Sequence, residues 1–140
     1  FLHIGISVID LEASIKFYSE IMQMNIERRN KYQGDLISRI VGVKDADLDI
    51  CVLEKNNLRI ELLDYNNDKR KKRIKYPNQD QPGLVHITFL VDNVDKEYER
   101  IKAYGYEFNS PPMVARKNGP KITYFKGPDN VVIEIYEKNY

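Results

Sequence analysis

The sequence predicts an α+β fold built from two copies of one module, in which a strand and a helix are followed by three further strands. Three observations support this prediction. The segments around the two histidines of the chain, His3 and His86, overlay at a constant shift of 83 positions (86 minus 3). Both segments alternate apolar and polar residues and then change to helical spacing. Both halves of the chain then end in a pair of strand-like runs joined by a short turn.

The overlay covers the first strand and the helix of each copy. Asp10 and Asn93 occupy equivalent positions and are suitable helix N-caps, and Gly105 is a suitable stop for the second helix. Each cap is followed by apolar residues at helical spacing. These are Leu11, Ile15, Tyr18 and Ile21 in the first copy, and Val94, Tyr98, Ile101 and Tyr104 in the second.

The remainder of each copy predicts three strands. In the first copy, a strand lies in MNIERRNKY and a hairpin pairs DLDICVLE with LRIELLDY around Lys55, Asn56 and Asn57. A short helix precedes this hairpin, in GDLISRIVGV, with four apolar residues on one side: Leu36, Ile37, Ile40 and Val41. In the second copy, a short strand lies in YEFNSPPMV, and a hairpin pairs KITYFK with VVIEIYE around Gly127, Pro128, Asp129 and Asn130.

The length of 140 residues suits one well-buried core or two small modules that share one. We predict a single domain with the first module at about 1–65, a linker at about 66–82 and the second module at about 83–140. The linker contains proline and is strongly basic, with Lys69, Arg70, Lys71, Lys72, Arg73 and Lys75. We interpret this run as solvated. The alternative is a landing site for an anionic substrate, such as a phosphorylated or CoA-linked acyl group.

The composition argues against a general nucleic-acid or membrane surface. The formal net charge is +1, and charges of both signs occur throughout the chain. No apolar run approaches the length of a membrane span, and the first residues predict a strand without a signal sequence ahead of it. Cys51 is the one cysteine, so no disulfide can form within the chain, and we expect its thiol to be buried and inert. A reducing compartment, the cytoplasm, is therefore expected.

Each copy of the module carries one histidine and one glutamate at equivalent places. His3 and His86 stand at the start of the first strands, whereas Glu61 and Glu134 each follow an isoleucine in the last strands. Alternate side chains leave a strand on opposite faces. All four polar side chains are therefore predicted to point away from the aliphatic face of their strand.

These four residues predict a metal site. A single histidine or glutamate in a strand is most simply a hydrogen-bonded or exposed residue. Four of them at equivalent places are different, because an ionised carboxylate in an aliphatic strand needs a partner, and a cation is the simplest one. Imidazole and carboxylate together suit one divalent ion of Zn, Ni, Co, Mn or Fe. We predict that the ligands His3, Glu61, His86 and Glu134 converge on one cavity.

The chain resembles the vicinal oxygen chelate superfamily, which includes glyoxalase I, methylmalonyl-CoA epimerase and extradiol dioxygenases. The resemblance spans essentially the whole chain and rests on HIGISVIDLEASIKFY, RIELLDY, GLVHITFLVDNVD and YFKGPDNVVIEIYE. In the last of these, a glycine-proline turn precedes a strand that ends in glutamate, which is characteristic of the family. The resemblance implies paired βαβββ modules that form a cupped mixed sheet around a divalent metal, with the same four residues as ligands.

The glyoxalase I resemblance implies a lyase or isomerase reaction. In this reaction a proton is removed beside a carbonyl, and the metal holds the resulting enediolate oxygen. Two histidines and two glutamates leave about two positions of an octahedron for water or substrate oxygens. The resemblance implies that one metal-site glutamate acts as the base, and we assign Glu134 first and Glu61 as its counterpart.

Three alternatives stay open. An epimerase-like isomerase needs a second acidic base, and Asp45, Asp47 and Asp49 lie in the comparable region without a clear match. An extradiol-type dioxygenase employs a further histidine that this chain lacks, although Tyr124 resembles a tyrosine of that group. A bleomycin-resistance-like binding module keeps the fold, lacks the metal ligands and sequesters a drug.

The expected partner is a small-molecule substrate, such as a thiol adduct or an acyl thioester. The candidate substrate contacts are Tyr124 and four possible anion contacts, namely Arg28, Arg39, Arg116 and Lys117. We also expect a homodimer, because two small modules rarely close a cup without burying their outer sheet edges. The family resemblance points the same way.

Overall fold

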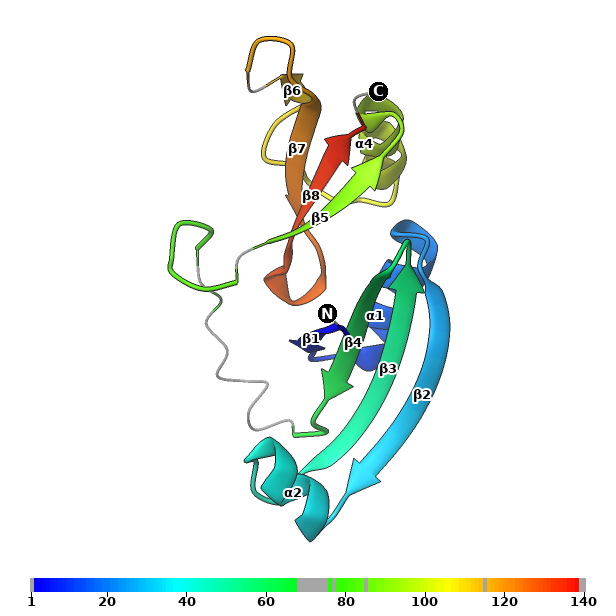
Figure 1. The fold of residues 1–140 in the computed structure, drawn as a ribbon, viewed down its shortest axis with the longest axis vertical. Coiled ribbons are helices and arrows are strands. Elements are labelled where there is room, and N and C mark those ends of the chain that lie inside the picture. Colours follow the sequence, from blue (N-terminus) through cyan, green and yellow to red (C-terminus); the bar gives the residue numbers. More distant parts are fainter. Residues whose placement is uncertain (1, 68–75, 77, 85, 115, 139–140) are drawn as a thin grey trace. The chain divides into compact units, whose positions relative to one another are not determined.

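The computed structural model describes residues 2–67, 76, 78–84, 86–114 and 116–138 (Figure 1). The chain divides into two compact units, residues 1–75 and 76–140, and each unit holds a four-stranded mixed sheet. The basic residues between Lys69 and Lys75 lie outside the described residues. In the described ranges, none of the helices has the length and apolar character needed to cross a membrane.

The first unit follows the predicted order of a strand, a helix and three strands. Its elements are β1 (Ile4–Ser7), α1 (Leu11–Lys16), the π-helical η1 (Phe17–Ile21), β2 (Asn25–Gln33), α2 (Asp35–Val41), β3 (Asp47–Lys55) and β4 (Leu58–Asp64). The sheet order is β1-β4-β3-β2, with β1 parallel to β4 and the other pairs antiparallel. Asp10 caps α1 as predicted, because its Oδ1 accepts a hydrogen bond from the backbone N–H of Ala13 at 2.9 Å.

The β3–β4 hairpin is confirmed at the predicted turn. Lys55 pairs with Leu58, and the two residues between them, Asn56 and Asn57, have φ values of 50° and 67°. Asparagine tolerates this left-handed region, and two such residues in a row match the twist of an antiparallel hairpin. The two asparagines therefore set the register that places Glu61 beside Val52.

Both faces of the first sheet carry buried apolar side chains. On one face, Leu53, Ile60 and Leu62 are fully buried, and α1 packs against β3 and β4. On the other face, which is the face of Glu61 by register and alternation, a second cluster is formed by Leu48, Ile50 and Val52. We call this second group the apolar cluster. The sequence did not predict it, because the alternation was expected to leave the Glu61 face polar.

The four apolar residues predicted on one side of α2 divide into two pairs. Ile37 and Val41 pack against the apolar cluster. Leu36 and Ile40 are 72% and 70% exposed. Residues four apart lie above one another on a helix, whereas neighbouring residues turn away. Because α2 contacts the sheet along a narrow stripe, one pair packs and the other faces outward.

The second unit repeats the plan. Its elements are β5 (His86–Val91), α4 (Val94–Ala103), β6 (Met113–Val114), β7 (Lys121–Lys126), the 3₁₀ turn η2 (Pro128–Asn130) and β8 (Val132–Glu137). The sheet order is β5-β8-β7-β6, with β5 parallel to β8. The side chain of Asn93 caps α4 by accepting from the backbone N–H of Lys96 at 2.8 Å, and Gly105, with φ of 93°, follows the end of the helix. Both helix boundaries are as predicted.

The core of the second unit lies between α4 and one face of its sheet. The helix packs against β7 and β8, and Figure 1 shows it alongside this sheet. Its residues Val94 and Ile101 are fully buried, as are Phe125, Ile133 and Ile135 of the strands. The alternate residues of the same strands lie on the opposite face. The helix therefore covers the aliphatic face and leaves the Glu134 face to the polar residues of the candidate site.

The single cysteine is buried on β3, as predicted. Cys51 has no exposed surface, and burial raises the pKa of its thiol. Arg29, the residue paired with Cys51 on β2, acts in the opposite direction with a smaller effect. A thiol in this setting is protonated at neutral pH and inaccessible to reagents.

Candidate metal centre

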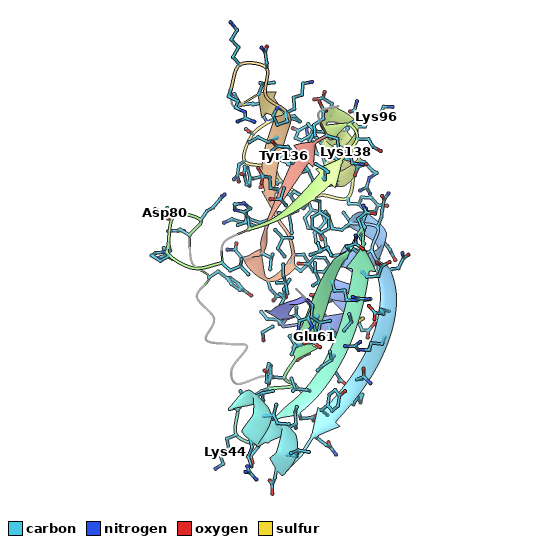
Figure 2. The ribbon with its side chains drawn as sticks, in the orientation of Figure 1. Lys44, Glu61, Asp80, Lys96, Tyr136 and Lys138 are labelled. Atoms are coloured by element: carbon cyan, nitrogen blue, oxygen red, sulfur yellow. The ribbon has the colours of Figure 1, made fainter. Side chains whose placement is uncertain are left out.

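The first histidine and glutamate lie together in the first unit. His3 precedes β1, and the parallel pairing of β1 with β4 sets Gly5 opposite Glu61. His3 Nε2 lies 3.2 Å from Glu61 Oε2. Figure 2 labels Glu61 on β4. We call this pair of residues the first half-site.

The second histidine and glutamate lie together in the second unit. His86 begins β5, and Glu134 lies on the neighbouring strand β8. The distance from His86 Nε2 to Glu134 Oε2 is 3.6 Å. Glu134 is buried, with 7% of its surface exposed. We call this pair the second half-site.

Two hydroxyl groups hold the carboxylate of the second half-site. Thr88 Oγ1 donates to Glu134 Oε2, and the Tyr124 hydroxyl donates to Glu134 Oε1, both at 2.6 Å. The strand register explains this arrangement, because Thr88 on β5 and Tyr124 on β7 are both directly paired with Glu134 on β8. The carboxylate is therefore contacted from both neighbouring strands.

Tyr124 also contacts the histidine of this half-site. The rings of Tyr124 and His86 meet edge to face with centroids 5.5 Å apart. Burial raises the pKa of Tyr124 to about 12, and its hydrogen bond to Glu134 adds to the rise. The phenol consequently keeps its proton at neutral pH and remains a hydrogen-bond donor. Tyr124, predicted as a substrate contact, thus contacts both residues of the second half-site.

Each half-site has the donor atoms of two ligands of one divalent ion. Two ligand atoms that are each about 2.1 Å from a metal lie about 3.0–3.4 Å apart in octahedral or tetrahedral geometry. The observed nitrogen–oxygen distances are 3.2 and 3.6 Å. In the second half-site, the buried His86 Nδ1 has no hydrogen-bond partner among the described residues. The residues therefore fit a metal in type, and the spacing fits in the first half-site and is slightly wider than this range in the second.

A half-site supplies two ligands. Within the part of the chain that the structure describes, no group of three or more histidine, cysteine, aspartate or glutamate side chains is close enough to hold a metal ion. The structure brings together the histidine and the glutamate of each unit. The convergence of all four residues on one cavity stays a prediction.

The four candidate anion contacts occupy different parts of the two units. Arg28 on β2 pairs with Val52, which in turn pairs with Glu61, so register places Arg28 on the face of the first half-site. Arg39 is exposed on α2. Arg116 and Lys117 are exposed between β6 and β7, and the described contacts do not join them to the second half-site.

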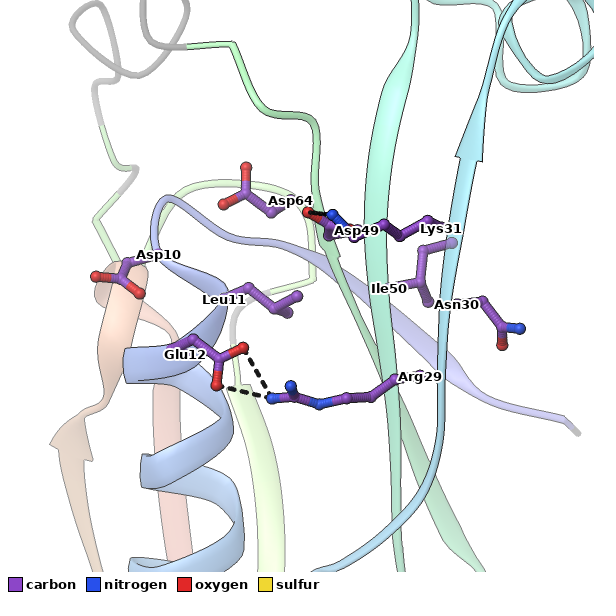
Figure 3. A pocket seen from close by; sticks show the side chains of 9 residues that line it. All are labelled: Asp10, Leu11, Glu12, Arg29, Asn30, Lys31, Asp49, Ile50 and Asp64. Carbon is purple, nitrogen blue, oxygen red and sulfur yellow. Dashed lines mark hydrogen bonds and ion pairs between the residues drawn. The ribbon is translucent and has the colours of Figure 1, made fainter.

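A separate cavity of about 430 Å³ lies in the first unit (Figure 3). Neither His3 nor Glu61 lines it. Two ion pairs cross it: Arg29 Nη2 lies 2.8 and 2.7 Å from the two carboxylate oxygens of Glu12, and Lys31 Nζ lies 3.0 Å from Asp49. The hydrogen bonds from Lys31 and from Asn66 lower the pKa of Asp49. These ion pairs engage both cations of the lining, and Asp10 and Asp64 line the cavity as well, so its lining carries more carboxylates than cations.

Sequence reasoning missed two parts of the centre. One is the donor role of Thr88 and Tyr124, and the other is the apolar cluster on the Glu61 face. Thr88 follows His86 by two residues, so strand alternation does place it on the same face. Its contact with Glu134, however, depends on the register between β5 and β8.

The chain is similar in sequence to known proteins. Residues 1–135 match the family model for the Glyoxalase/Bleomycin resistance protein/Dioxygenase superfamily. The uncharacterized protein YwbC of Bacillus subtilis is 26% identical over 137 residues, which cover 97% of this chain and 95% of that protein. The lactoylglutathione lyase of Neisseria meningitidis serogroup A is 29% identical over 145 residues, covering 98% of this chain and 89% of that protein.

A solved structure has the same fold. The glyoxalase family protein from Bacillus cereus superposes with a TM-score of 0.81 at 21% identity. The match covers 98% of this chain and 92% of that chain. At this level of identity the similarity shows the fold, and it confirms the α+β arrangement with two βαβββ modules that the sequence predicts.

Proposed function

The chain belongs to the glyoxalase/bleomycin resistance protein/dioxygenase superfamily, and from that premise we propose that it is a metal-dependent lyase or isomerase of the glyoxalase I type. The proposed reaction moves a proton at a carbon beside a carbonyl. One observation carries the proposal: a histidine and a glutamate meet at equivalent places in both units. Members of the superfamily often bind divalent metals, and several relatives of this chain are named lactoylglutathione lyases.

In this proposal, the two half-sites together bind one divalent ion. They supply two imidazole nitrogens and two carboxylates, a set that suits Zn, Ni, Co or Mn. The two carboxylate charges balance a divalent cation. The chemistry that the bound ion supplies is Lewis-acid polarisation of the carbonyl oxygen, which lowers the cost of removing the neighbouring proton.

The protein residues supply the base and the surroundings of the reaction. A half-site carboxylate, Glu61 or Glu134, accepts the proton and returns it. Val52 of the apolar cluster is buried and directly paired with Glu61, so water is excluded from that side of the carboxylate, and interactions between charges strengthen where water is excluded. Arg28 lies on the same face and is placed to contact an anionic part of a thiol adduct or an acyl thioester.

The described contacts favour the glyoxalase-like reaction over the epimerase-like one. An epimerase of this type needs an acidic residue as a second base. Asp47 and Asp49 alternate with the apolar cluster on β3 and so lie on the opposite face from Glu61. Asp49 is also engaged by Lys31. Asp47 and Asp49 are therefore not placed to act with Glu61, and Asp45 is exposed in the turn before β3.

The experiment is solvent deuterium exchange with metal-loaded protein. Hemithioacetals and 2-substituted acyl thioesters are incubated in heavy water, and deuterium is measured at the carbon beside the carbonyl. We expect incorporation from the hemithioacetals, and we expect His86→Ala to lose it along with the metal. Absence of exchange across the whole panel would overturn the proposal. Oxygen consumption with a catechol would instead indicate an extradiol-type dioxygenase. Drug binding without stoichiometric metal would indicate a bleomycin-resistance-like binding module.

A further inference from the structure

The Glu134 carboxylate is held at both oxygens. Thr88 and Tyr124 each donate a hydroxyl hydrogen bond to it, one to each oxygen, at 2.6 Å. O–H···O⁻ bonds of this length are among the strong hydrogen bonds of proteins. Because Glu134 is 7% exposed, movement away from these donors would leave a buried charge and two hydroxyl groups without their partners. Glu134 is thus fixed in position, while each oxygen keeps a lone pair for a metal.

The Glu61 carboxylate is held at one point. Its two directly paired neighbours are Gly5 and Val52, and neither carries a side-chain donor. Its polar contact among the described residues is His3 Nε2 at 3.2 Å. The Glu61 side chain is also twice as exposed as that of Glu134, at 18% against 9%. Glu61 can therefore turn away from its histidine without breaking a hydroxyl hydrogen bond.

We infer that Thr88 and Tyr124 are positioning residues that keep Glu134 as a fixed ligand, and that Glu61 is the carboxylate that accepts the proton. This inference rests on the proposed proton-transfer reaction, and it reverses the order of the two glutamates predicted from the sequence. A carboxylate that leaves a metal to meet a substrate C–H bond needs freedom to turn. Of the two, Glu61 has that freedom.

The proton transfer balances within a hemithioacetal and one carboxylate. The C–H bond of the hydroxyl-bearing carbon breaks, its electron pair forms a C=C bond, and the π pair of the neighbouring carbonyl moves to oxygen. The proton forms an O–H bond with Glu61. Glu61 then returns it to the neighbouring carbon, which binds it with the C=C pair. The hydroxyl proton passes from the first oxygen to the second, and the O–H pair left on the first oxygen forms the carbonyl of the product. The product is the isomeric hydroxy thioester, and no oxidant, reductant or co-reactant is consumed.

The positioning role is tested with Co²⁺ as the probe and the full chain. Thr88→Val and Tyr124→Phe each remove one hydroxyl and keep the size of the side chain. We expect each change to weaken Co²⁺ binding by about 10- to 100-fold and to alter the Co²⁺ absorption spectrum, because the ligand carboxylate loses its orientation. Tyr104→Phe is the matched control, since this tyrosine is exposed at the end of α4. If Thr88→Val and Tyr124→Phe match Tyr104→Phe in affinity and spectrum, the positioning role is overturned.

The division of labour is tested with the two glutamine variants at saturating Co²⁺. Glu61→Gln is expected to bind Co²⁺, since an amide oxygen can face a metal, but to lose deuterium exchange by about 100- to 10,000-fold because an amide accepts no proton. Glu134→Gln is expected to bind Co²⁺ more weakly than Glu61→Gln and to keep more exchange once loaded. Full exchange in Glu61→Gln, or a larger loss in Glu134→Gln, would show that the assignment of the base is wrong.

The failure of this inference differs from the failure of the proposed function. The Co²⁺ affinities and spectra need no turnover, so they test directly whether Thr88 and Tyr124 position Glu134. Absence of exchange in the wild-type protein concerns the proposed reaction instead. Weaker Co²⁺ binding in Thr88→Val and Tyr124→Phe supports the positioning role of the two hydroxyl groups whatever the substrate is.

Discussion

In the first unit, the glutamate of the last strand stands beside a glycine and a valine, whereas in the second unit it stands beside a threonine and a tyrosine. The backbone plan of the two units is the same, and so is the contact between histidine and glutamate. The hydrogen bonds that hold the two carboxylates are not. We propose that the two equivalent glutamates differ in mobility, and that this difference separates a fixed ligand from a base.

The faces around the two half-sites also differ. The first half-site shares its face with the apolar cluster and with the α2 residues that pack on it. The second half-site is surrounded by the hydroxyl groups of Thr88 and Tyr124 and by the ring of Tyr124, which lies against that of His86. The polar surroundings donate two hydrogen bonds to Glu134, whereas the strand neighbours of Glu61 donate none from their side chains.

The largest expected effect concerns the buried strand face that both units share. Ile60 and Ile133 each precede the half-site glutamate and have no exposed surface. Truncating either to alanine removes buried methyl groups and leaves a cavity, so each change should lower the free energy of unfolding by about 2–5 kcal/mol. Chemical denaturation measures this loss. Leu36→Ala is the control, because that exposed residue should change stability by no more than about 0.5 kcal/mol.

An unequal result would break the equivalence of the two cores. If Ile133→Ala cost several kcal/mol and Ile60→Ala matched the surface control, the first unit would lack the packed strand face described for it. The repeat would then describe the order of the elements without describing their packing.

The second prediction concerns a substitution that gives the first half-site a hydroxyl donor like that of the second. A Cβ atom at Gly5 would meet Leu63 Cδ1 at 3.5 Å, an ordinary contact, so a side chain fits there. Gly5→Thr places a hydroxyl beside Glu61 at the position equivalent to Thr88. A hydrogen bond to a charged group contributes enough to slow exchange by about tenfold or more. Gly5→Val is the matched control, because it has the same shape and no hydroxyl.

Deuterium exchange and Co²⁺ titration together test this prediction. We expect Gly5→Thr to slow exchange relative to Gly5→Val without weakening Co²⁺ binding. Equal exchange rates in the two variants would contradict the view that freedom of the Glu61 carboxylate matters.

The smallest expected effect concerns charges outside the half-sites. The hydrogen bonds from Lys31 and Asn66 hold the pKa of Asp49 below its ordinary value of 3.8. Because the folded pKa is the lower one, the stabilisation is present above about pH 4 and is lost as the pH falls through the folded pKa. Lys31→Ala should therefore be less stable than wild type at neutral pH, and the difference should disappear in acid. Thermal unfolding followed over this pH range measures it, and a difference that persists at the lowest pH would contradict the assignment.

Most of the fold could be predicted because its signals are local. Alternation marks β1 and β5, capping side chains mark α1 and α4, and the two asparagines mark the β3–β4 turn. The sides of α2 could not be predicted in this way. Four apolar residues at helical spacing do not reveal how wide the contact with the sheet is, and in α2 one pair packs while the other is exposed.

The candidate site was predictable to the level of its His–Glu pairs. Strand alternation and the repeat identify the four residues and the face on which each lies. The hydroxyl donors at Glu134 depend on which residues of three strands stand opposite one another, and distant parts of the chain determine that register. Tyr124 is predicted as a substrate contact and resembles a tyrosine of the extradiol dioxygenases, but its sequence neighbours do not reveal its bond to Glu134.

The central claim is that the two His–Glu pairs are halves of a metal site, and metal content tests it most directly. Protein purified without chelator, or reconstituted with Zn²⁺, Ni²⁺, Co²⁺ or Mn²⁺ and dialysed, is analysed by elemental mass spectrometry. The account predicts one divalent ion per chain in the wild-type protein. It predicts loss of that ion in both His3→Ala and His86→Ala, with the folded state checked by thermal unfolding. Wild-type protein without stoichiometric metal in all five preparations, or two histidine variants that keep the full complement, would contradict it.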